Sequence, residues 1–230
     1  LSLAVGGKLS RRLKYLSSVG NLDKIFLFFV GDFDGADKKS ILSQEFLNQL
    51  DADGVNQFIK SYLDKQEGGS LSKILYLDTK VSLPDDMLMK VDKMTMAHSI
   101  EARAPLLDHV FAEFCATIHS RLKIDSGVGK IILRKALVGK VPDAIVNKRK
   151  TGFSIPKVTW LNEIKELIPQ ILSEKSVRKR SYFNEKINSV IKNYDKNSQR
   201  VWSLLMLEIW HRIFIDSDKP KPVTGIDKLL

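Results

Sequence analysis

The stretch SIEARAPLLD, residues 99–108, places a carboxylate and a guanidinium two positions apart in an apolar neighbourhood. Methionine, alanine and isoleucine precede the two charged residues, and leucine, valine and phenylalanine follow them. Burying a charged side chain costs several kcal/mol unless the charge is paired or hydrogen-bonded. We therefore expect Glu101 and Arg103 either to form an internal ion pair or to be held in place for chemistry.

Three further blocks accompany this stretch in a fixed order. They are LPDDMLMKVDKMTMA at 83–97, KIILRKA at 130–136, and KRKTGFSIP at 148–156, which follows Pro142. Together the four blocks resemble the EARxPxLD, LPxxLxKxD, KxxLRxA and RKxGFxxP signatures in the synthetase domain of glutamine-hydrolysing asparagine synthetases. The resemblance is strongest over residues 75–160, whereas the flanks fit by position and helical character.

The resemblance implies a mainly α fold. Residues 1–217 are expected to be the helical C-terminal portion of a doubly wound α/β ATP-pyrophosphatase domain (adenine nucleotide alpha hydrolase-like) that lacks most of its parallel sheet, and 218–230 a polar tail. The family's SGGxDS phosphate loop, its GEGADE-like run and its N-terminal glutaminase cysteine do not occur in the sequence. We therefore expect a fragment that is inactive alone and exposes apolar patches near 26–30 and 94–107.

The resemblance also implies a reaction. In the family, ATP activates the side-chain carboxylate of aspartate as a β-aspartyl-adenylate, and ammonia derived from glutamine then gives asparagine and AMP. The implied ligands are aspartate, glutamine or ammonia, ATP and Mg²⁺, the last two bound mainly by upstream segments. The implied partners are the upstream glutaminase and ATP-loop regions, and a homodimer is compatible with the family.

The residues expected to serve this reaction follow from the matched motifs. Glu101 is the candidate acid/base or substrate-orienting group, since the attacking ammonia must lose a proton. Lys150 precedes a glycine turn where the family places a lysine near the phosphates, and fixed cations stabilise the developing negative charge. Arg103, Lys130 and Arg149 are weaker candidates for substrate or phosphate binding. The structural alternatives are a salt bridge between Glu101 and Arg103 and an exposed basic loop at 148–150.

Charge patterning leaves other functions open. The net charge is +10, and residues 121–160 hold ten Lys and Arg against Asp125 and Asp143, a net +8. Such a block attracts polyanions, including nucleotide phosphates and nucleic acid, or it is simply a solvated surface. Nucleic acid is not expected, because no aromatic-plus-basic recognition motif accompanies the block. A β-lactam synthetase-like or peptide-modifying enzyme that adenylates its substrate on the same scaffold is the closer alternative.

Composition limits the remaining classes. The hydrophobic share of 43% and the charged share of 28% are typical of a globular protein. No apolar run reaches about 18 residues, so no membrane-spanning helix is expected. The single Cys115 excludes an intramolecular disulfide and favours the cytoplasm. His98 and His109 lack metal-ligand spacing, so no metal site is expected within the chain.

Local signals predict several helix boundaries. Ser82 followed by Pro84 predicts a helix start, and the methionines that follow are expected to fill the core. Asp108 is expected to cap the next helix. The aromatic residues Trp202, Trp210 and Phe214 are expected to pack in the core. The helices predicted after Asp108 cover residues 109–120, 130–139, 158–172, 185–193 and 199–215.

Overall fold

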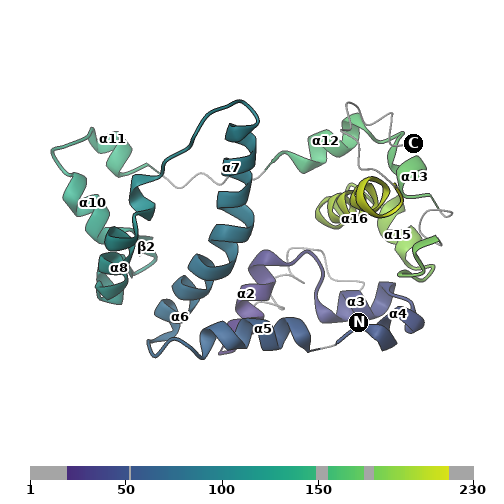
Figure 1. Ribbon diagram of the computed structural model, residues 1–230, viewed down its shortest axis with the longest axis horizontal. Coiled ribbons are helices and arrows are strands. Elements are labelled where there is room, and N and C mark those ends of the chain that lie inside the picture. The colour runs from purple at the N-terminus through teal and green to yellow at the C-terminus, as the bar shows by residue number, and fades with distance from the viewer. Residues whose placement is uncertain (1–19, 52, 149–154, 174–178, 218–230) are drawn as a thin grey trace. The chain divides into compact units, whose positions relative to one another are not determined.

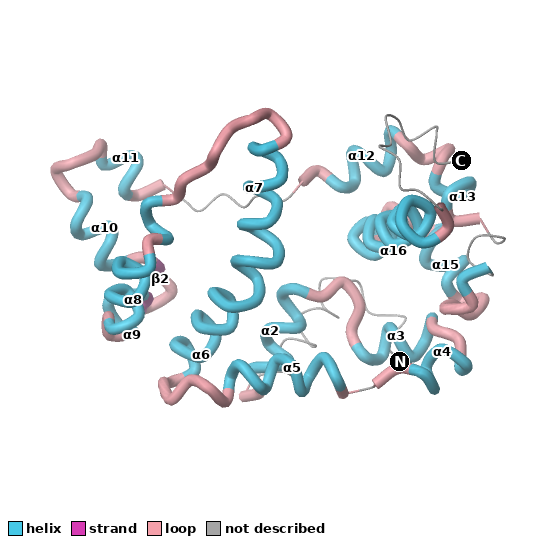
Figure 2. Tube along the Cα trace, viewed as in Figure 1, coloured by secondary structure: helices cyan, strands magenta, loops and turns pink. Residues whose placement is uncertain are grey.

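The computed structural model describes residues 20–51, 53–148, 155–173 and 179–217, and these are mostly helical (Figures 1 and 2). Their one sheet is a two-stranded antiparallel hairpin. The prediction of a mainly α chain is therefore confirmed for the described residues. The chain divides into two compact units: residues 24–54 with 155–217 form the first, and residues 55–148 make up nearly all of the second.

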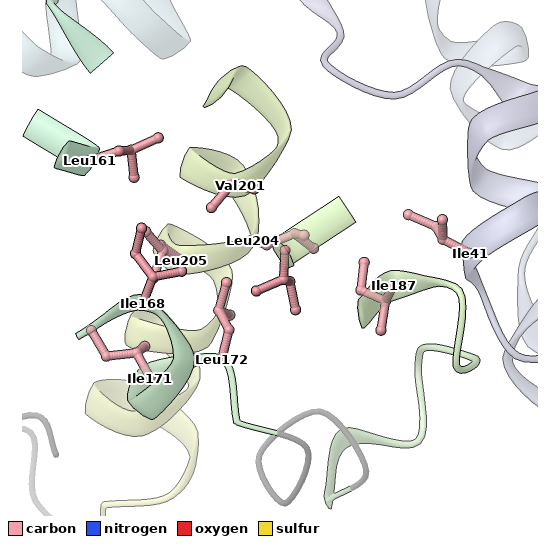
Figure 3. Packing of buried hydrophobic residues seen from close by; sticks show 10 residues of the cluster. Ile41, Leu161, Ile168, Ile171, Leu172, Ile187, Val201, Leu204 and Leu205 are labelled. Carbon is pink, nitrogen blue, oxygen red and sulfur yellow. The ribbon is translucent and has the colours of Figure 1, made fainter. Parts of the chain in front are cut away.

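The first unit is a helical cluster assembled around α16. Figure 3 shows Val201, Leu204 and Leu205 on α16, with isoleucines from neighbouring helices beside them. Because side chains from five helices are buried together, this core is the main source of stability for the unit. The elements of the unit are α2 (Leu22–Val30), α3 (Gly35–Ile41), α4 (Gln44–Gln49), α12 (Lys157–Glu163), α13 (Ile168–Ile171), α15 (Ile187–Lys192), α16 (Ser198–Trp210) and a π-type turn, η3 (His211–Ile215).

Hydrogen bonds from side chains to backbone carbonyls join the two distant segments of this unit. The Ser43 hydroxyl donates to the Ser181 carbonyl at 2.7 Å and also caps α4. The Asn184 side chain donates to the carbonyls of Ser40 and Leu42, both at 2.9 Å. Because these bonds cross more than 130 positions of sequence, residues 24–54 and 155–217 fold as one body.

The second unit contains one long helical stretch and a group of short elements. The long stretch runs through α6 (Ser70–Leu77), a π-type segment η1 (Asp78–Leu88) and α7 (Met89–Met96). The other elements are α5 (Gly54–Leu63), a 3-10 turn η2 (Pro105–Leu107), α8 (His109–Thr117), α9 (Ser120–Lys123), β1 (Ile124–Asp125), β2 (Val128–Gly129), α10 (Ile131–Leu137) and α11 (Asp143–Val146).

The predicted helix start at Ser82 is wrong. The helical stretch is already formed at residue 70, and Pro84 lies inside it. A proline removes one backbone donor and crowds the carbonyl four positions earlier, and here the wider π-type geometry runs through it. The Ser82 hydroxyl donates to the Asp78 carboxylate at 3.2 Å instead of capping a helix.

Two predictions about the core are also wrong. The methionines of η1 and α7 are exposed, with Met94 at 64%, so this stripe does not fill a core among the described residues. Trp210 and Phe214 are exposed as well, while Trp202 packs on the edge of the core of the first unit. Helical spacing indicates which side chains share a face, but it does not say whether that face is covered.

Candidate functional site

The segment that carries Glu101 begins at a well-defined helix end. After α7, the N–H of Ile100 donates to the Thr95 carbonyl and that of Ser99 to the Met96 carbonyl, both at 3.0 Å. Ser99 adopts a left-handed conformation with φ 59°, as the penultimate residue of such a termination motif requires. Glu101 therefore leaves the helix in a fixed direction, on the loop that Figure 2 shows after α7.

The segment ends at an equally clear helix start. Pro105 opens the short turn η2, and the Asp108 carboxylate accepts a hydrogen bond from the Phe111 N–H at 3.1 Å. The prediction that Asp108 caps the next helix is confirmed. The residues of the signature are thus held between a helix termination motif and an N-cap.

Glu101 and Arg103 form an ion pair, but they are not buried. One Nη of Arg103 lies 2.5 Å from a carboxylate oxygen of Glu101, and their side chains are 68% and 83% exposed. Residues two apart share a face in an extended segment, which brings the groups together. The expectation of buried charges is wrong for the described residues. An exposed pair contributes only about 0–1 kcal/mol, so its value to stability is small.

Exposed apolar side chains precede and follow the pair in the sequence, and the prediction of exposed apolar residues at 94–107 is confirmed. Within residues 94–107, the exposed large apolar side chains are those of Met94, Met96, Ile100, Leu106 and Leu107. The second predicted patch is only partly confirmed, because Phe29 and Val30 are exposed whereas Phe26 is buried.

Lys130 occupies an unusual backbone position at the start of α10. It adopts a left-handed conformation with φ 60° and ψ 34°, and its side chain is exposed. No hydrogen bond or ion pair links Lys130 to Glu101 or Arg103 within the described residues. Arg149 and Lys150 lie outside the described residues, so of the five predicted site residues the structure brings only Glu101 and Arg103 into contact.

A buried ion-pair cluster in the first unit was missed by sequence reasoning. Arg180 donates to the Glu208 carboxylate at 2.9 and 3.1 Å and to the Asp216 carboxylate at 2.8 and 2.7 Å. Arg212 donates to Glu208 at 2.8 Å. The side chains of Arg180 and Glu208 are only 8% and 7% exposed. The four-residue spacing of Glu208 and Arg212 was the one local signal of this cluster.

The cluster holds its members in their charged forms. Burial alone would raise the pKa of Glu208, but hydrogen bonds from Arg180 and Arg212 bring that pKa below its ordinary value. Hydrogen bonds to Asp216 and Glu208 raise the pKa of Arg180, and the bond from Arg180 lowers the pKa of Asp216. Arg180, Glu208 and Asp216 are therefore charged at neutral pH.

His211 lies beside this cluster without a partner for one ring nitrogen. It is 6% exposed, and its Nδ1 has no hydrogen-bond partner among the described residues. It helps to line a small pocket with Arg180, Tyr182 and Glu208. Burial lowers the pKa of His211, and the positive charge of Arg180 lowers it further by a smaller amount. The negative charges of Glu208 and Asp216 act in the opposite direction. The pocket contains none of the predicted site residues.

The free energy of unfolding of the first unit is expected to fall as the pH drops below about 6.5, the ordinary pKa of histidine. The lowered pKa keeps His211 neutral in the fold, whereas the unfolded chain takes up a proton near that pH. Urea titrations between pH 5.5 and 7.5 measure this slope. Tryptophan fluorescence reports on this unit, because all three tryptophans lie in it.

His211→Gln is expected to flatten this pH dependence, and His98→Gln, at an exposed position, is the control that should retain it. If the free energy of unfolding of His211→Gln depends on pH as strongly as that of the wild type, His211 is not the source of the pH dependence.

The described residues offer no evident metal centre. They contain no group of three or more His, Cys, Asp or Glu side chains placed to hold an ion. None of the described helices has the length and apolar character that crossing a lipid bilayer requires.

Comparison with known proteins places the chain in a family. The family model described as asparagine synthase matches residues 15–212. Asparagine synthetase (glutamine-hydrolyzing) 1 of Bacillus subtilis is 35% identical over 162 residues, which cover 68% of this chain and 26% of the relative. Asparagine synthetase (glutamine-hydrolyzing) of Gallus gallus is 29% identical over 103 residues, covering 40% of this chain and 18% of the relative.

The comparisons also set the extent of the match. The chain spans about a quarter of the length of the Bacillus subtilis relative. No solved structure matches the chain. Since the family model covers most of the sequence and includes all four motif blocks, the chain belongs to the asparagine synthase family.

Proposed function

We propose that this chain forms part of an ATP-dependent ligase that converts aspartate to asparagine through a β-aspartyl-adenylate, with glutamine as the source of ammonia. The observation that carries the proposal is the placement of Glu101. Its carboxylate is exposed on a short segment fixed at both ends, within a chain of the asparagine synthase family. An exposed carboxylate on a fixed backbone can reach a bound substrate, whereas a carboxylate buried in the protein core cannot.

In this proposal each predicted residue has a distinct task. Glu101 accepts a proton from the attacking ammonia, and Arg103, 2.5 Å away, orients its carboxylate. Lys150 is assigned to bind the phosphate groups of ATP, with weaker contributions from Lys130 and Arg149. A positive charge there stabilises the pyrophosphate that leaves when the adenylate forms.

Other parts of the reaction require residues beyond those described. Because the chain spans about a quarter of its Bacillus subtilis relative, we assign the phosphate loop, the Mg²⁺ ligands and the glutaminase to other segments of the complete gene product. Bound Mg²⁺ would neutralise phosphate charge. The complete domain is then a doubly wound α/β fold, to which residues 1–217 contribute helices and 218–230 a tail. We further propose a cytoplasmic enzyme that assembles as a homodimer.

The test is an assay of the complete product of the gene that encodes this chain. With aspartate, ATP and glutamine or ammonia, it should form asparagine, AMP and pyrophosphate in equal amounts. Formation of AMP and pyrophosphate with another carboxylate substrate, and no asparagine from aspartate, would instead favour the β-lactam synthetase-like alternative. Absence of any ATP-dependent amide formation would refute both.

Replacing Lys150 with alanine is expected to lower kcat about 10²-fold, the cost of removing one charge-stabilising group, with little change in the KM for aspartate. The reason is that Lys150 is proposed to act on the phosphates rather than on the amino acid. Steady-state kinetics with the complete gene product measure both constants. Lys140→Ala, an exposed change of the same charge, is the matched control. Wild-type kcat in Lys150→Ala would remove Lys150 from the site.

A further inference from the structure

Arg134 ties together two turns that carry basic side chains. It is a half-buried residue of α10, and its Nε donates to the Gly129 carbonyl at 3.1 Å. One of its Nη atoms donates to the Val146 carbonyl. Gly129 directly precedes Lys130, and Val146 ends α11 two positions before Lys148. One guanidinium therefore fixes the backbone at both places.

The backbone conformation of Lys130 explains why this restraint by Arg134 is needed. A residue with a Cβ atom adopts the left-handed region only at an energetic cost, and Lys130 lies there. The carbonyl that Arg134 binds belongs to the peptide unit between Gly129 and Lys130, so the bond restrains the rotation that sets φ of Lys130. The backbone N–H of Arg134 also donates to the Lys130 carbonyl at 2.9 Å. Lys130 is thus held from both sides.

We propose that Arg134 is a positioning residue that holds Lys130 and Lys148 for one anionic ligand, the phosphate groups of ATP or of released pyrophosphate. This inference rests on the proposed function, in which Lys130 contacts phosphate. Both lysines are exposed and belong to backbone segments bound by one guanidinium. Arginine suits this task because its rigid planar group donates in several fixed directions, whereas a lysine ammonium is a point charge on a flexible stem.

A double-mutant cycle in the complete gene product tests the inference. The constant kcat/KM for ATP is measured for the wild type, Lys130→Ala, Arg134→Gln and the double variant. Each single change is expected to lower it about 10- to 100-fold, since small displacements at an active site have effects of that size. If Arg134 acts through Lys130, the double variant is no worse than the poorer single variant, because the two changes remove the same interaction.

The outcomes separate two kinds of failure. If Arg134→Gln has its full effect in the Lys130→Ala background, Arg134 does not act through Lys130, and the inference is overturned while the role of Lys130 stands. If Lys130→Ala leaves kcat/KM for ATP unchanged, the assignment of Lys130 in the proposed function is itself wrong, and the inference fails with it.

A second variant covers the case in which Arg134→Gln does not fold. Arg134→Lys keeps the positive charge but cannot donate to the Gly129 and Val146 carbonyls at the same time. The constant kcat/KM for ATP should therefore fall, while the KM for aspartate stays unchanged. Wild-type kinetics in Arg134→Lys would overturn the inference. Lys135→Gln, which removes a positive charge from an exposed neighbour on α10, is the control and should change kcat/KM by less than about twofold.

Discussion

Replacing Glu101 with glutamine is expected to lower asparagine formation by the complete gene product about 10²- to 10⁴-fold, the usual contribution of a positioned acid or base. Glutamine keeps the size of the side chain but cannot accept a proton as a carboxylate does. Adenylate formation does not need that proton transfer, so aspartate-dependent exchange of pyrophosphate into ATP should persist in part. The two activities are measured separately, by asparagine analysis and by isotope exchange.

The control for this change is Glu113→Gln. Glu113 is an exposed glutamate on α8 of the same unit, and its substitution removes the same charge without touching the signature. Asparagine formation should remain at the wild-type level in this variant. Undiminished asparagine formation in Glu101→Gln would show that Glu101 is not the base. Loss of isotope exchange to the same extent as asparagine formation would indicate a role in binding aspartate or ATP instead.

Local signals in the sequence predicted local structure well. Asp108 caps α8 as expected, because an N-cap depends only on one side chain and backbone donors within three residues. One helix start was predicted wrongly. Pro84 was interpreted as the first turn of a helix, yet it lies inside a stretch that begins at Ser70, since a π-type segment accommodates it. Among the described prolines Pro84 is the exception, because Pro105, Pro142, Pro156 and Pro169 all lie at helix starts.

Burial was the property that sequence predicted least well. Glu101 and Arg103 were expected to be buried because apolar residues flank them, but those residues are themselves exposed. Conversely, the buried cluster of Arg180 was not predicted, because its partners Glu208 and Asp216 lie 28 and 36 positions away. Neighbours in sequence do not decide what covers a side chain; long-range packing does.

The second large effect is expected for Glu208→Gln, which should lower the free energy of unfolding of the first unit by about 3–5 kcal/mol, the usual cost of removing one partner from a buried ion pair. Glutamine fills nearly the same space but carries no charge. Arg180, 8% exposed, and Arg212 would then lack the carboxylate that both now contact. Urea unfolding followed by tryptophan fluorescence at pH 7.5 measures the change, since all three tryptophans lie in this unit.

A matched control distinguishes a buried cluster from charge removal in general. Glu166, whose side chain is 84% exposed and lies 3.9 Å from Lys165, belongs to the same unit. Glu166→Gln should change the free energy of unfolding by less than about 0.5 kcal/mol, as is usual for surface substitutions. If both variants lose equally little stability, the Arg180 cluster is accessible to water in solution. If only Glu208→Gln unfolds at a lower urea concentration, the free energy of unfolding of the first unit depends on a carboxylate that two arginines share.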